Sequence, residues 1–533
     1  MTVVVSAPPP GPASLDAVVE LARRWVDRVL CLQAARNPSP GAQSRFSVSA
    51  SEVVRILTGA PTPTEAEARA GSLDAQIEQL WRSLVDGPAS PLAALVRAFA
   101  LDDTSARVIA ALLAPEVSAD LERAYAYAWD DFTRKRPDVG FLSLLVGGRD
   151  AVARDRVRRA LGPDSTLRRA RVVLIGGGGA PDTPPFVNRT VRLSDRVVDH
   201  LRGDEQLDEA LEALCRVAAP LPALADMVIA PVFVEQTRRA LAREAGAIGP
   251  PRLLLPGPAG VGKAMLVEAL AREAGRPVLR VDLPAILRDD DRMADRLGRV
   301  WREAALRDAW VLLRGGSEIS SDVVRRPTAE RFADLLRHIG TTVVITAHAR
   351  PAWLAPQLAT LVEIALRAPN LGERIELWRR ALPADTPLLD PADLDVIAGR
   401  YAFTGGSVTR AADRAAARAR LESPADPRIS LGALSDAARL LLSHNLGSVA
   451  ERIPPGFVWA DLVLPEDTLE RIREVVSFAR HRAYLLEAWG FGKKLPYGRG
   501  VSAILAGPPG TGKTMVAQLL SRELGYDLFR IDL

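Results

Sequence analysis

The sequence of 533 residues is 48% hydrophobic and 25% charged, and its formal net charge is +4 at pH 7. These values are typical of a soluble globular protein with about three or four domains. A net charge this small for the length favours a mixed, solvated surface over a large basic face for an acidic partner.

Cysteine and histidine usage limits the chemistry further. The sequence contains two cysteines, Cys31 and Cys215, and five scattered histidines. This pattern excludes a disulfide framework, argues against a zinc site, and fits a reducing compartment. The first twelve residues have no secretory pattern, and no apolar run approaches the length of a membrane span. We therefore expect a cytoplasmic protein without a membrane partner.

The amino-terminal part of the chain is predicted to be helical and free of catalytic motifs. Residues 1–13 are rich in proline and are expected to form a disordered lead. Residues 14–90 are expected to form a helical region in which apolar side chains recur at helical spacing. The helices predicted there cover residues 14–35, 51–57 and 72–85.

Residues 91–203 are predicted to form a winged-helix-like domain, because helical patterns are followed by a short hairpin. Residues 139–145, which we interpret as the recognition segment, are apolar and poor in lysine and arginine. We therefore expect this domain to dock a protein, and we interpret Arg134, Lys135 and Arg136 as a solvated helix end. The predicted helices cover residues 91–99, 104–113, 118–133, 139–145 and 151–161, and the strands cover 171–175 and 190–193.

A connector at residues 204–231 is predicted to be helical over 204–219 and broken by prolines after that. It leads into a module at residues 232–445 that contains a glycine-rich loop between a strand (252–256) and a helix. Such a loop can turn backbone N–H groups towards phosphate, and its lysine can reach the outer phosphates. Its candidate nucleotide-binding residues are Gly257, Gly260, Gly262 and Lys263.

The chemistry of this first P-loop is incomplete. Ala264 stands where a serine or threonine hydroxyl would bind magnesium. The predicted strand at residues 309–313 is followed by Arg314, where a hydrolytic P-loop protein needs a carboxylate. We therefore expect a degenerate module, meaning one without the groups for hydrolysis. Further helices are predicted at residues 370–382, 390–401, 408–421 and 431–444.

A second glycine-rich loop fits the P-loop pattern at every fixed position. A strand is predicted before it at residues 501–506, and a helical pattern follows it. Lys513 can offset phosphate charge, and the hydroxyl of Thr514 can bind Mg²⁺. The predicted nucleotide-binding residues are Gly507, Pro508, Pro509, Gly510, Thr511, Gly512, Lys513 and Thr514.

The sequence ends soon after this loop, within a strand predicted at residues 527–532. The carboxylates that would hold magnesium and activate water would follow later in such a module. We therefore expect residues 456–533 to be the start of a second module, and the chain to be a fragment of a longer protein.

The loop sequence Gly-Pro-Pro-Gly-Thr-Gly-Lys-Thr at 507–514 resembles that of the AAA ATPase family, and the resemblance covers residues 232–533. Residues 459–465 resemble the family's segment beside adenine. The resemblance implies a helical lid in the first module, with Arg410 as either a sensor arginine or an exposed helix arginine. It also implies two further losses there, namely Ala349 in place of a sensor asparagine and no arginine finger between residues 354 and 361.

The amino-terminal order from Phe99 through Leu145 is similar to a winged-helix module in front of certain bacterial AAA ATPases. Some of those ATPases are encoded with phage-tail-like contractile injection particles. The fold implied is α/β, with P-loop AAA modules made of a parallel sheet, flanking helices and a helical lid. A mostly helical region with a winged helix precedes them.

The function implied by the resemblance is ATP hydrolysis with Mg²⁺, which drives remodelling of a protein client in a homo-oligomeric ring of six subunits. Two alternatives stay open. One is a scaffold that binds nucleotide without hydrolysing it, and the other is a DNA-binding regulator that uses the winged helix. We expect no nucleic-acid partner.

Overall fold

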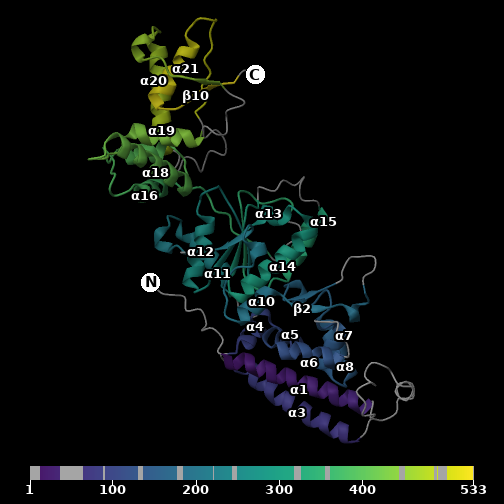
Figure 1. The fold of residues 1–533 in the computed structure, drawn as a ribbon. Helices are drawn as coiled ribbons and strands as arrows, with labels where there is room; N and C mark the ends of the chain where they lie inside the picture. Colours follow the sequence, from purple (N-terminus) through teal and green to yellow (C-terminus); the bar gives the residue numbers. More distant parts are fainter. Residues whose placement is uncertain are drawn as a thin grey trace.

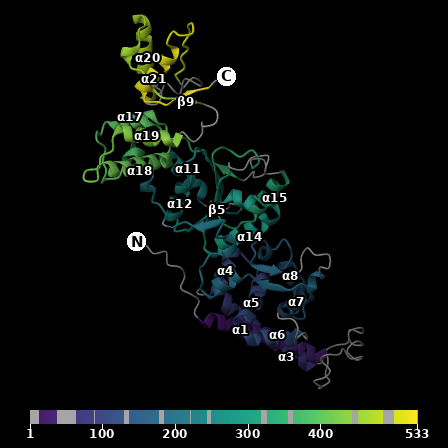
Figure 2. The same ribbon diagram turned by 45° about the horizontal axis from the view of Figure 1, so that its top comes forward.

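The computed structural model has an elongated arrangement of four successive parts (Figure 1). A helical amino-terminal part is followed by an α/β layer, a helical lid, and a carboxy-terminal segment beyond the lid, as a tilted view also shows (Figure 2). The structure describes residues 12–36, 64–87, 90–129, 136–176, 184–219, 221–242, 249–316, 326–354, 361–442, 451–484, 489 and 501–531.

The first helix, α1 (Pro12–Arg36), is the spine of the amino-terminal part. It packs along α3 (Thr64–Val85) and also contacts α5, α6 and α7 of the region that follows. Apolar residues at three- and four-residue spacing give α1 one buried stripe, in which Leu21 and Trp25 are fully buried. The helices predicted at 14–35 and 72–85 are confirmed, whereas residues 1–11 and 51–57 lie outside the described ranges.

A group of helices and a hairpin follow α3. Strands β1 (Val173–Ile175) and β2 (Val191–Leu193) pair antiparallel, and Asp138 adds a bridge to Thr190. These strands and the helices before them confirm the predicted outline. The helices are α4 (Pro91–Phe99), α5 (Asp103–Val117), α6 (Ala119–Trp129), α7 (Val139–Gly147), α8 (Ala151–Ala160), α9 (Thr166–Arg169) and α10 (Asp195–Leu201), with a 3-10 turn, η2 (Phe186–Asn188), before β2.

The predicted recognition segment is placed differently from our expectation. In α7, Val139, Leu142 and Leu145 are fully buried, so this helix cannot present a face to a partner. A helix that is apolar on every side belongs in a core, and this is the physical reason why the prediction is wrong. The exposed helix is the next one, α8, whose surface carries mainly arginines.

The predicted helix at residues 204–219 is also wrong. This segment contains only a short 3-10 turn, η3 (Glu209–Leu211), and then a strand, β3 (Cys215–Val217). Strand β3 pairs antiparallel with β5 (Val278–Asp282), so hydrogen bonds to the edge of the sheet override the local helical pattern. The segment therefore extends the sheet of the first module instead of connecting to it as a helix.

A six-stranded sheet forms the centre of the first module, in the order β3-β5-β6-β7-β4-β8. All neighbouring strands are parallel except the β3–β5 pair. Their side chains alternate between two cores, as a pleated strand requires. Leu253 and Leu255 face one core, and Leu254 faces the other. The remaining strands are β4 (Arg252–Pro256), β6 (Trp310–Arg314), β7 (Val343–Ala347) and β8 (Val362–Glu363).

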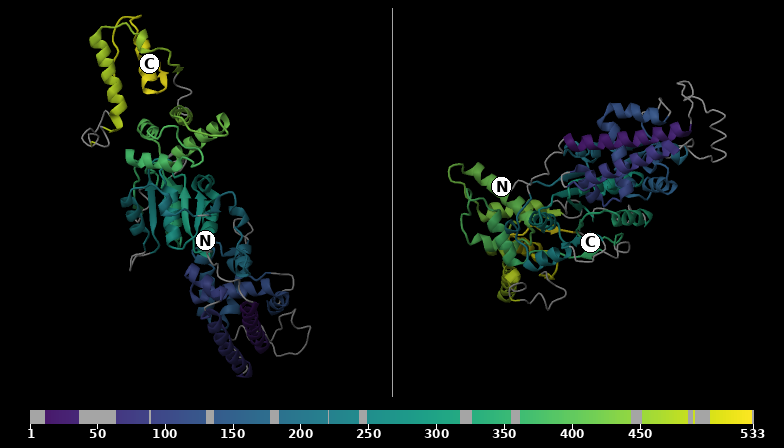
Figure 3. Two further views of the ribbon diagram at one scale, coloured as in Figure 1. Left: turned by 90° about the vertical axis from the view of Figure 1, so that its left-hand side faces the viewer. Right: turned by 90° about the horizontal axis from the view of Figure 1, so that it is seen from below.

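Helices cover both faces of this sheet (Figure 3, left). On one face, α12 (Lys263–Glu273) packs on Leu253, Leu255 and Leu312 near α11 (Pro231–Leu241). On the other face lie α13 (Leu283–Leu287), α14 (Asp290–Leu306) and α15 (Arg326–Arg337). This second core is continuous with that of the amino-terminal part, so both parts share one apolar interior.

Buried charges on α14 cross the boundary between these two parts. Glu303 is fully buried and accepts hydrogen bonds from Arg196 Nε at 2.9 Å and Arg307 Nε at 3.2 Å. Its neighbour Arg302 donates to Ser194 Oγ at 2.6 Å and forms an ion pair with Asp208. Burial opposes ionisation of Asp208, but the arginine charges hold its pKa below the ordinary value.

The lid has a small core of its own around Trp378, which is fully buried. Its helices are α16 (Leu371–Ala381), α17 (Asp393–Arg400), α18 (Gly405–Glu422) and α19 (Leu431–Leu442). Each overlaps one of the four helices predicted there. The cap of α16 is a reciprocal pair, because Asn370 Oδ1 accepts from Glu373 N and Asn370 N donates to Glu373 Oε2, both at 2.8 Å.

The carboxy-terminal segment contains α20 (Glu466–Ala483) and α21 (Lys513–Leu524), with an antiparallel pair of short strands. These are β9 (Glu451–Ile453) and β10 (Leu528–Arg530), the second of which confirms the strand predicted at 527–532. The strand predicted at 501–506 is absent, and Ile504 is 95% exposed. Within the described ranges no strand lies beside it, and a strand without a neighbour has no ladder to join. Every helix in those ranges is too short or too polar to cross a lipid bilayer.

The buried ion pairs predict a large stability effect. We expect Glu303→Gln to lower the free energy of unfolding by about 3 kcal/mol, because the buried Arg196 loses its hydrogen-bonded carboxylate and keeps only Glu205, at 3.7 Å. The matched control is Glu422→Gln, which removes an exposed pair with Arg418 and should cost about 1 kcal/mol or less. Urea unfolding followed by tryptophan fluorescence measures both. Equal losses for the two variants would contradict the role assigned to the buried network.

Candidate nucleotide-binding sites

The two P-loops have the same backbone conformation although they differ in chemistry. In the first, Gly260 and Gly262 have φ values of 74° and 97°. In the second, Gly510 and Gly512 have φ values of 85° and 84°. These values lie in the left-handed region that glycine adopts without a steric penalty. Both loops can therefore turn their backbone N–H groups inward, as a phosphate requires.

The lysines of the two loops lie in equivalent places. Lys263 Nζ donates to the carbonyl oxygens of Gly257 and Pro258 at 2.6 and 2.7 Å. Lys513 Nζ donates to those of Gly507 and Pro508 at 2.9 and 2.7 Å. Burial lowers the pKa of Lys263, which is the ordinary effect of removing an ammonium group from water. An anionic phosphate in either loop would satisfy the ammonium group better than carbonyl oxygens do.

The two loops differ in their fit to magnesium. Thr514 follows Lys513 in the first turn of α21 and is exposed, so its hydroxyl oxygen can serve as a ligand of Mg²⁺. In the first loop Ala264 offers no oxygen at this position. Across the described residues, no group of three or more histidine, cysteine, aspartate or glutamate side chains could hold a metal ion. The residues of the second loop fit Mg²⁺, and those of the first loop do not.

Arg314 ends β6 at the edge of the sheet where the first P-loop begins. Leu313 is aligned with Ile345 of β7, so the next residue, Arg314, is level with Thr346. Thr346 is in turn aligned with Leu255 near the end of β4. Arg314 is exposed, and its partner in the register on the other side is Asp282. The structure therefore places a cation, two strands from the P-loop strand, where hydrolytic modules place a carboxylate.

A pocket of about 350 Å³ lies between the first P-loop and the lid. One wall comes from the segment before α11, one from the lid, and the floor from the loop itself. Most of the lining is apolar, with few polar groups, which is the usual character of a small-molecule site. Representative lining residues are Met227, Ile229 and Phe233 before and in α11, Val261 and Gly262 in the loop, and Leu377 and Gly406 in the lid.

The wall before α11 was missed at the sequence level, although an internal repeat marks it. A 3-10 turn, η4 (Leu224–Asp226), is capped by Asp226, whose Oδ2 accepts from Ala223 N at 2.9 Å. The corresponding turn of the second module, η6 (Trp459–Asp461), is capped in the same way by Asp461, at 2.8 Å from Val458 N. Both turns contain Ala-Asp and continue with three apolar residues, Met-Val-Ile and Leu-Val-Leu. Comparing the two stretches would have found this wall.

The lid is bonded directly to the first P-loop. Thr404 Oγ1 donates to Ala259 O at 2.7 Å, and Gly406 N donates to Gly260 O at 3.1 Å. The approach is so close that a Cβ atom on Gly260 would lie 2.6 Å from Thr404 Oγ1. The beginning of α18 therefore packs directly on the P-loop, and this contact forms one side of the pocket.

Other predicted residues lie away from the pocket or outside the described ranges. Arg410 is exposed, and its Nε donates to Gly406 O in its own helix at 3.2 Å, as an exposed helix arginine does. Residues 355–360, where an arginine finger would be expected, and 317–325 are not in the described part of the chain. Ala349 follows β7 as predicted and has no polar side chain.

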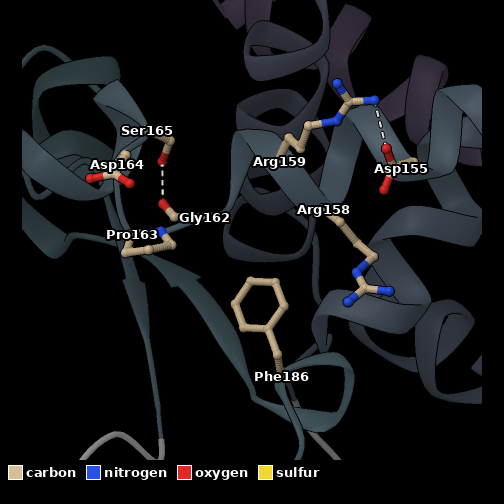
Figure 4. Close-up of a pocket in the computed structure, with 8 residues that line it drawn as sticks. All are labelled: Asp155, Arg158, Arg159, Gly162, Pro163, Asp164, Ser165 and Phe186. Atoms are coloured by element: carbon tan, nitrogen blue, oxygen red, sulfur yellow. Dashed lines mark hydrogen bonds and ion pairs between the residues drawn. The ribbon is translucent and has the colours of Figure 1, made fainter.

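A second hollow lies on the surface of the amino-terminal part, between α8 and η2 (Figure 4). Arg158 and Arg159 of α8 and Phe186 of η2 line it, together with two carboxylates. Asp155 accepts from Arg159 at 2.6 Å, and Asp164 accepts from Arg169 at 2.9 Å. The hollow therefore has mixed charge rather than a purely basic surface.

Two protein-family descriptions match the sequence. Residues 15–214 match "Winged helix domain, variant", and this match spans both the predicted helical region and the predicted winged-helix-like domain. Residues 253–319 and 503–533 match "ATPase family associated with various cellular activities (AAA)". Each of the two AAA matches contains one P-loop.

Curated relatives match the chain at low identity. Protein SAV of Sulfolobus acidocaldarius is 26% identical over 53% of this chain and 40% of its own length. The ATPase family gene 2 protein of Schizosaccharomyces pombe is 25% identical over 53% of this chain and 38% of its own length. Human ATPase family gene 2 protein homolog A is 24% identical over 67% of this chain and 42% of its own length.

The chain thus spans about two fifths of the length of these relatives. Their names are not those of ATPases of contractile injection systems, which the sequence resemblance had suggested. A crystal structure of the FIGL-1 AAA domain is similar to 44% of this chain and 90% of its own, at 17% identity and a TM-score of 0.36.

The contact between lid and loop predicts unequal effects of two glycine substitutions. We expect Gly260→Ala to lower the midpoint of thermal unfolding more than Gly510→Ala. Both positions have positive φ, which costs an alanine about 1–2 kcal/mol, but only the Cβ at residue 260 meets Thr404. Nothing lies within 4 Å of a Cβ at residue 510. Differential scanning calorimetry measures the difference, and an equal shift would show that the lid does not rest on the loop.

Proposed function

We propose that this chain is a member of the AAA ATPase family with an amino-terminal winged-helix domain, and that it binds ATP with Mg²⁺ through its second P-loop. The observation that carries this proposal is the loop at residues 507–514, which combines left-handed glycines with Lys513 and Thr514. Its amide groups and the N-terminus of α21 are suited to a triphosphate. Gly507, Gly510 and Gly512 allow the turn, while Pro508, Pro509 and Thr511 complete the loop.

In this proposal each residue has a separate role. Lys513 offsets the charge of the outer phosphates, and Thr514 contributes its hydroxyl to Mg²⁺. When bound, the metal would neutralise phosphate charge and polarise the phosphoryl group. ATP hydrolysis by the whole protein is part of the proposal and requires carboxylates that are not among the described residues of this module. The match to the AAA family supports hydrolysis. Hydrolysis stays a proposal because this chain spans only part of the length of its relatives.

We propose that the first module has a structural role and does not hydrolyse ATP. It keeps the fold of a P-loop module, but Ala264 and Arg314 replace two groups that hydrolysis needs. Its sheet shares a core with the winged-helix domain and its lid contacts the second module, so it lies between the two (Figure 3, left). Domain limits of 91–203 for the winged helix, 232–445 for this module and 456–533 for the next are part of the proposal.

The expected setting of the activity is a homo-oligomeric ring, with six subunits by family resemblance, that remodels a protein client in the cytoplasm. The match to the AAA family supports the ring. One intact P-loop and one degenerate P-loop in the same chain support a single site of ATP hydrolysis in each subunit. An association with contractile injection particles rests on the resemblance of the winged-helix sequence alone. A scaffold that binds ATP without hydrolysing it is the alternative, and phosphate release by the whole protein would exclude it.

The chain offers a direct comparison between its two pockets. We expect Lys513→Ala to abolish most magnesium-dependent ATP binding and Lys263→Ala to do much less, because only the second loop has a metal ligand. Isothermal titration calorimetry with ATP, in MgCl₂ and again in EDTA, measures the magnesium-dependent part of the binding in the wild type and both variants. Each lysine bonds to two loop carbonyls, so the substitutions remove equivalent contacts. Equal losses would show that the two pockets have been ranked wrongly.

The exposed arginines of α8 are the specific observation that favours DNA binding as a second candidate function. Against it, Arg159 is paired with Asp155 beside the hollow, which leaves few unpaired cations for phosphates. We therefore expect no retention of duplex DNA at physiological salt, and no change in the double variant Arg156→Glu, Arg158→Glu. Gel-shift titrations at several salt concentrations provide the measurement. Salt-dependent binding that the double variant abolishes would favour the DNA-binding function.

A further inference from the structure

The pocket of the first module keeps three features of a nucleotide site but lacks the groups that bind a metal. The glycine loop, the lysine and the apolar cavity between loop and lid are all present. Magnesium does not fit, because Ala264 has no side-chain oxygen and β6 ends in Arg314 instead of a carboxylate. A site that had lost its ligand would be free to fill this cavity with side chains, yet about 350 Å³ stays open.

The charges around this loop are unbalanced in favour of an anion. Lys263 is half-buried, and its ammonium group contacts only neutral carbonyl oxygens among the described residues. Two nearby carboxylates are already used within the protein. Glu373 accepts two hydrogen bonds from Arg367, at 2.6 and 2.8 Å, and Asp226 caps its own turn. Arg314 adds a second positive charge at the same edge of the sheet, beside Asp282, whose Oδ1 caps α13 by accepting from Ala285 N at 3.1 Å.

The position of Arg314 suits it to a phosphate. Strand β7 lies between β6 and β4, and neighbouring strands are roughly 5 Å apart, so Arg314 and the end of β4 are separated by about 10 Å. After Arg314 the chain turns towards β7, where Gly316 N donates to Thr346 O at 3.1 Å. A guanidinium group carries a permanent charge and can bind a phosphate through two N–H groups. It can therefore neutralise phosphate charge where a hydrolytic module uses Mg²⁺.

We propose that the first pocket binds a nucleoside di- or triphosphate without a divalent cation, and that Lys263 and Arg314 together offset its phosphate charge. The inference rests on the structural role proposed above for the first module and names the ligand that this role would use. The phosphates lie in the loop, and the base lies in the apolar cavity against Met227 and Leu377. No step of hydrolysis follows, because no group among the described residues of this site orients or activates water.

Such a ligand would hold three separate segments together. The cavity is walled by the segment before α11, by the P-loop and by the lid, so one molecule contacts all of them. It would add to the two hydrogen bonds that join Thr404 and Gly406 to the loop. A ligand that binds only the folded state stabilises it in proportion to the logarithm of its concentration. The nucleotide would then serve as a structural cofactor of the first module, which supports the second module.

The test uses the full chain with Lys513→Ala, so that the second loop is silenced and the first pocket alone responds. ATP and ADP are titrated calorimetrically in EDTA and again in MgCl₂. We expect binding in both solutions, with dissociation constants that differ by less than about threefold, and a higher unfolding temperature with nucleotide in EDTA. Adding Arg314→Gln should weaken binding in EDTA by roughly tenfold or more, since it removes a charge-assisted contact.

A matched control and a conversion make the test specific. Arg337→Gln removes an exposed arginine paired with Asp334 on α15, and it should leave binding in EDTA unchanged. The double change Ala264→Thr, Arg314→Asp should make binding depend on magnesium. The unfolding temperature of each variant without nucleotide verifies that it is folded.

Two results would overturn the inference. One is no nucleotide binding to the Lys513→Ala chain in either solution, and the other is binding that appears only with magnesium. Either result leaves the proposed function intact if the wild type still binds ATP with magnesium through the second loop. Failure of the proposed function would be seen in the wild type instead, because magnesium would then add no ATP binding there beyond that of the Lys513→Ala chain.

Discussion

Arg302 and Glu303 are adjacent on α14, and both are buried at the boundary between the helical amino-terminal part and the first α/β module. A buried charge is tolerated only when a partner of opposite charge is held in place. The partners here, Asp208 and Arg196, belong to segments before the sheet, so the charges fix the position of one part on the other. A continuous apolar core surrounds them. This interface therefore fixes how the sheet, with its P-loop and lid, is oriented relative to the amino-terminal part.

The two P-loops show that the shape of a site and its chemistry are set by different residues. Glycines in the left-handed region give both loops one conformation, and both lysines bond to equivalent carbonyl oxygens. The differences lie in side chains that project from this shared frame, of which Ala264 and Thr514 are the clearest pair. A P-loop can thus lose its metal ligand without losing its fold, because the ligand contributes nothing to the turn.

Much of the fold could be predicted because local patterns and tertiary contacts agree there. Strand β4 and the helix after its glycine loop were predicted from the sequence, and so were the residues of both loops. The prediction failed where burial or pairing decides: α7 looked like a recognition helix, β3 looked helical, and residues 501–506 looked like a strand. The contact of Thr404 with Ala259 joins residues 145 positions apart, and no local pattern indicates it.

The same contact sets how easily the lid can move. Two hydrogen bonds hold the start of α18 on the loop, and each contributes about 1 kcal/mol in net terms. Arg380 of α16 adds a hydrogen bond to Ala225 O at 2.7 Å, so the lid is held on the module by a few contacts that are each worth only a few times the thermal energy. The lid lies on the path between the sheet and α20, because α17 of the lid contacts α20 directly. A force applied to the carboxy-terminal segment would accordingly break the contacts between lid and P-loop before it separated the buried ion pairs of α14.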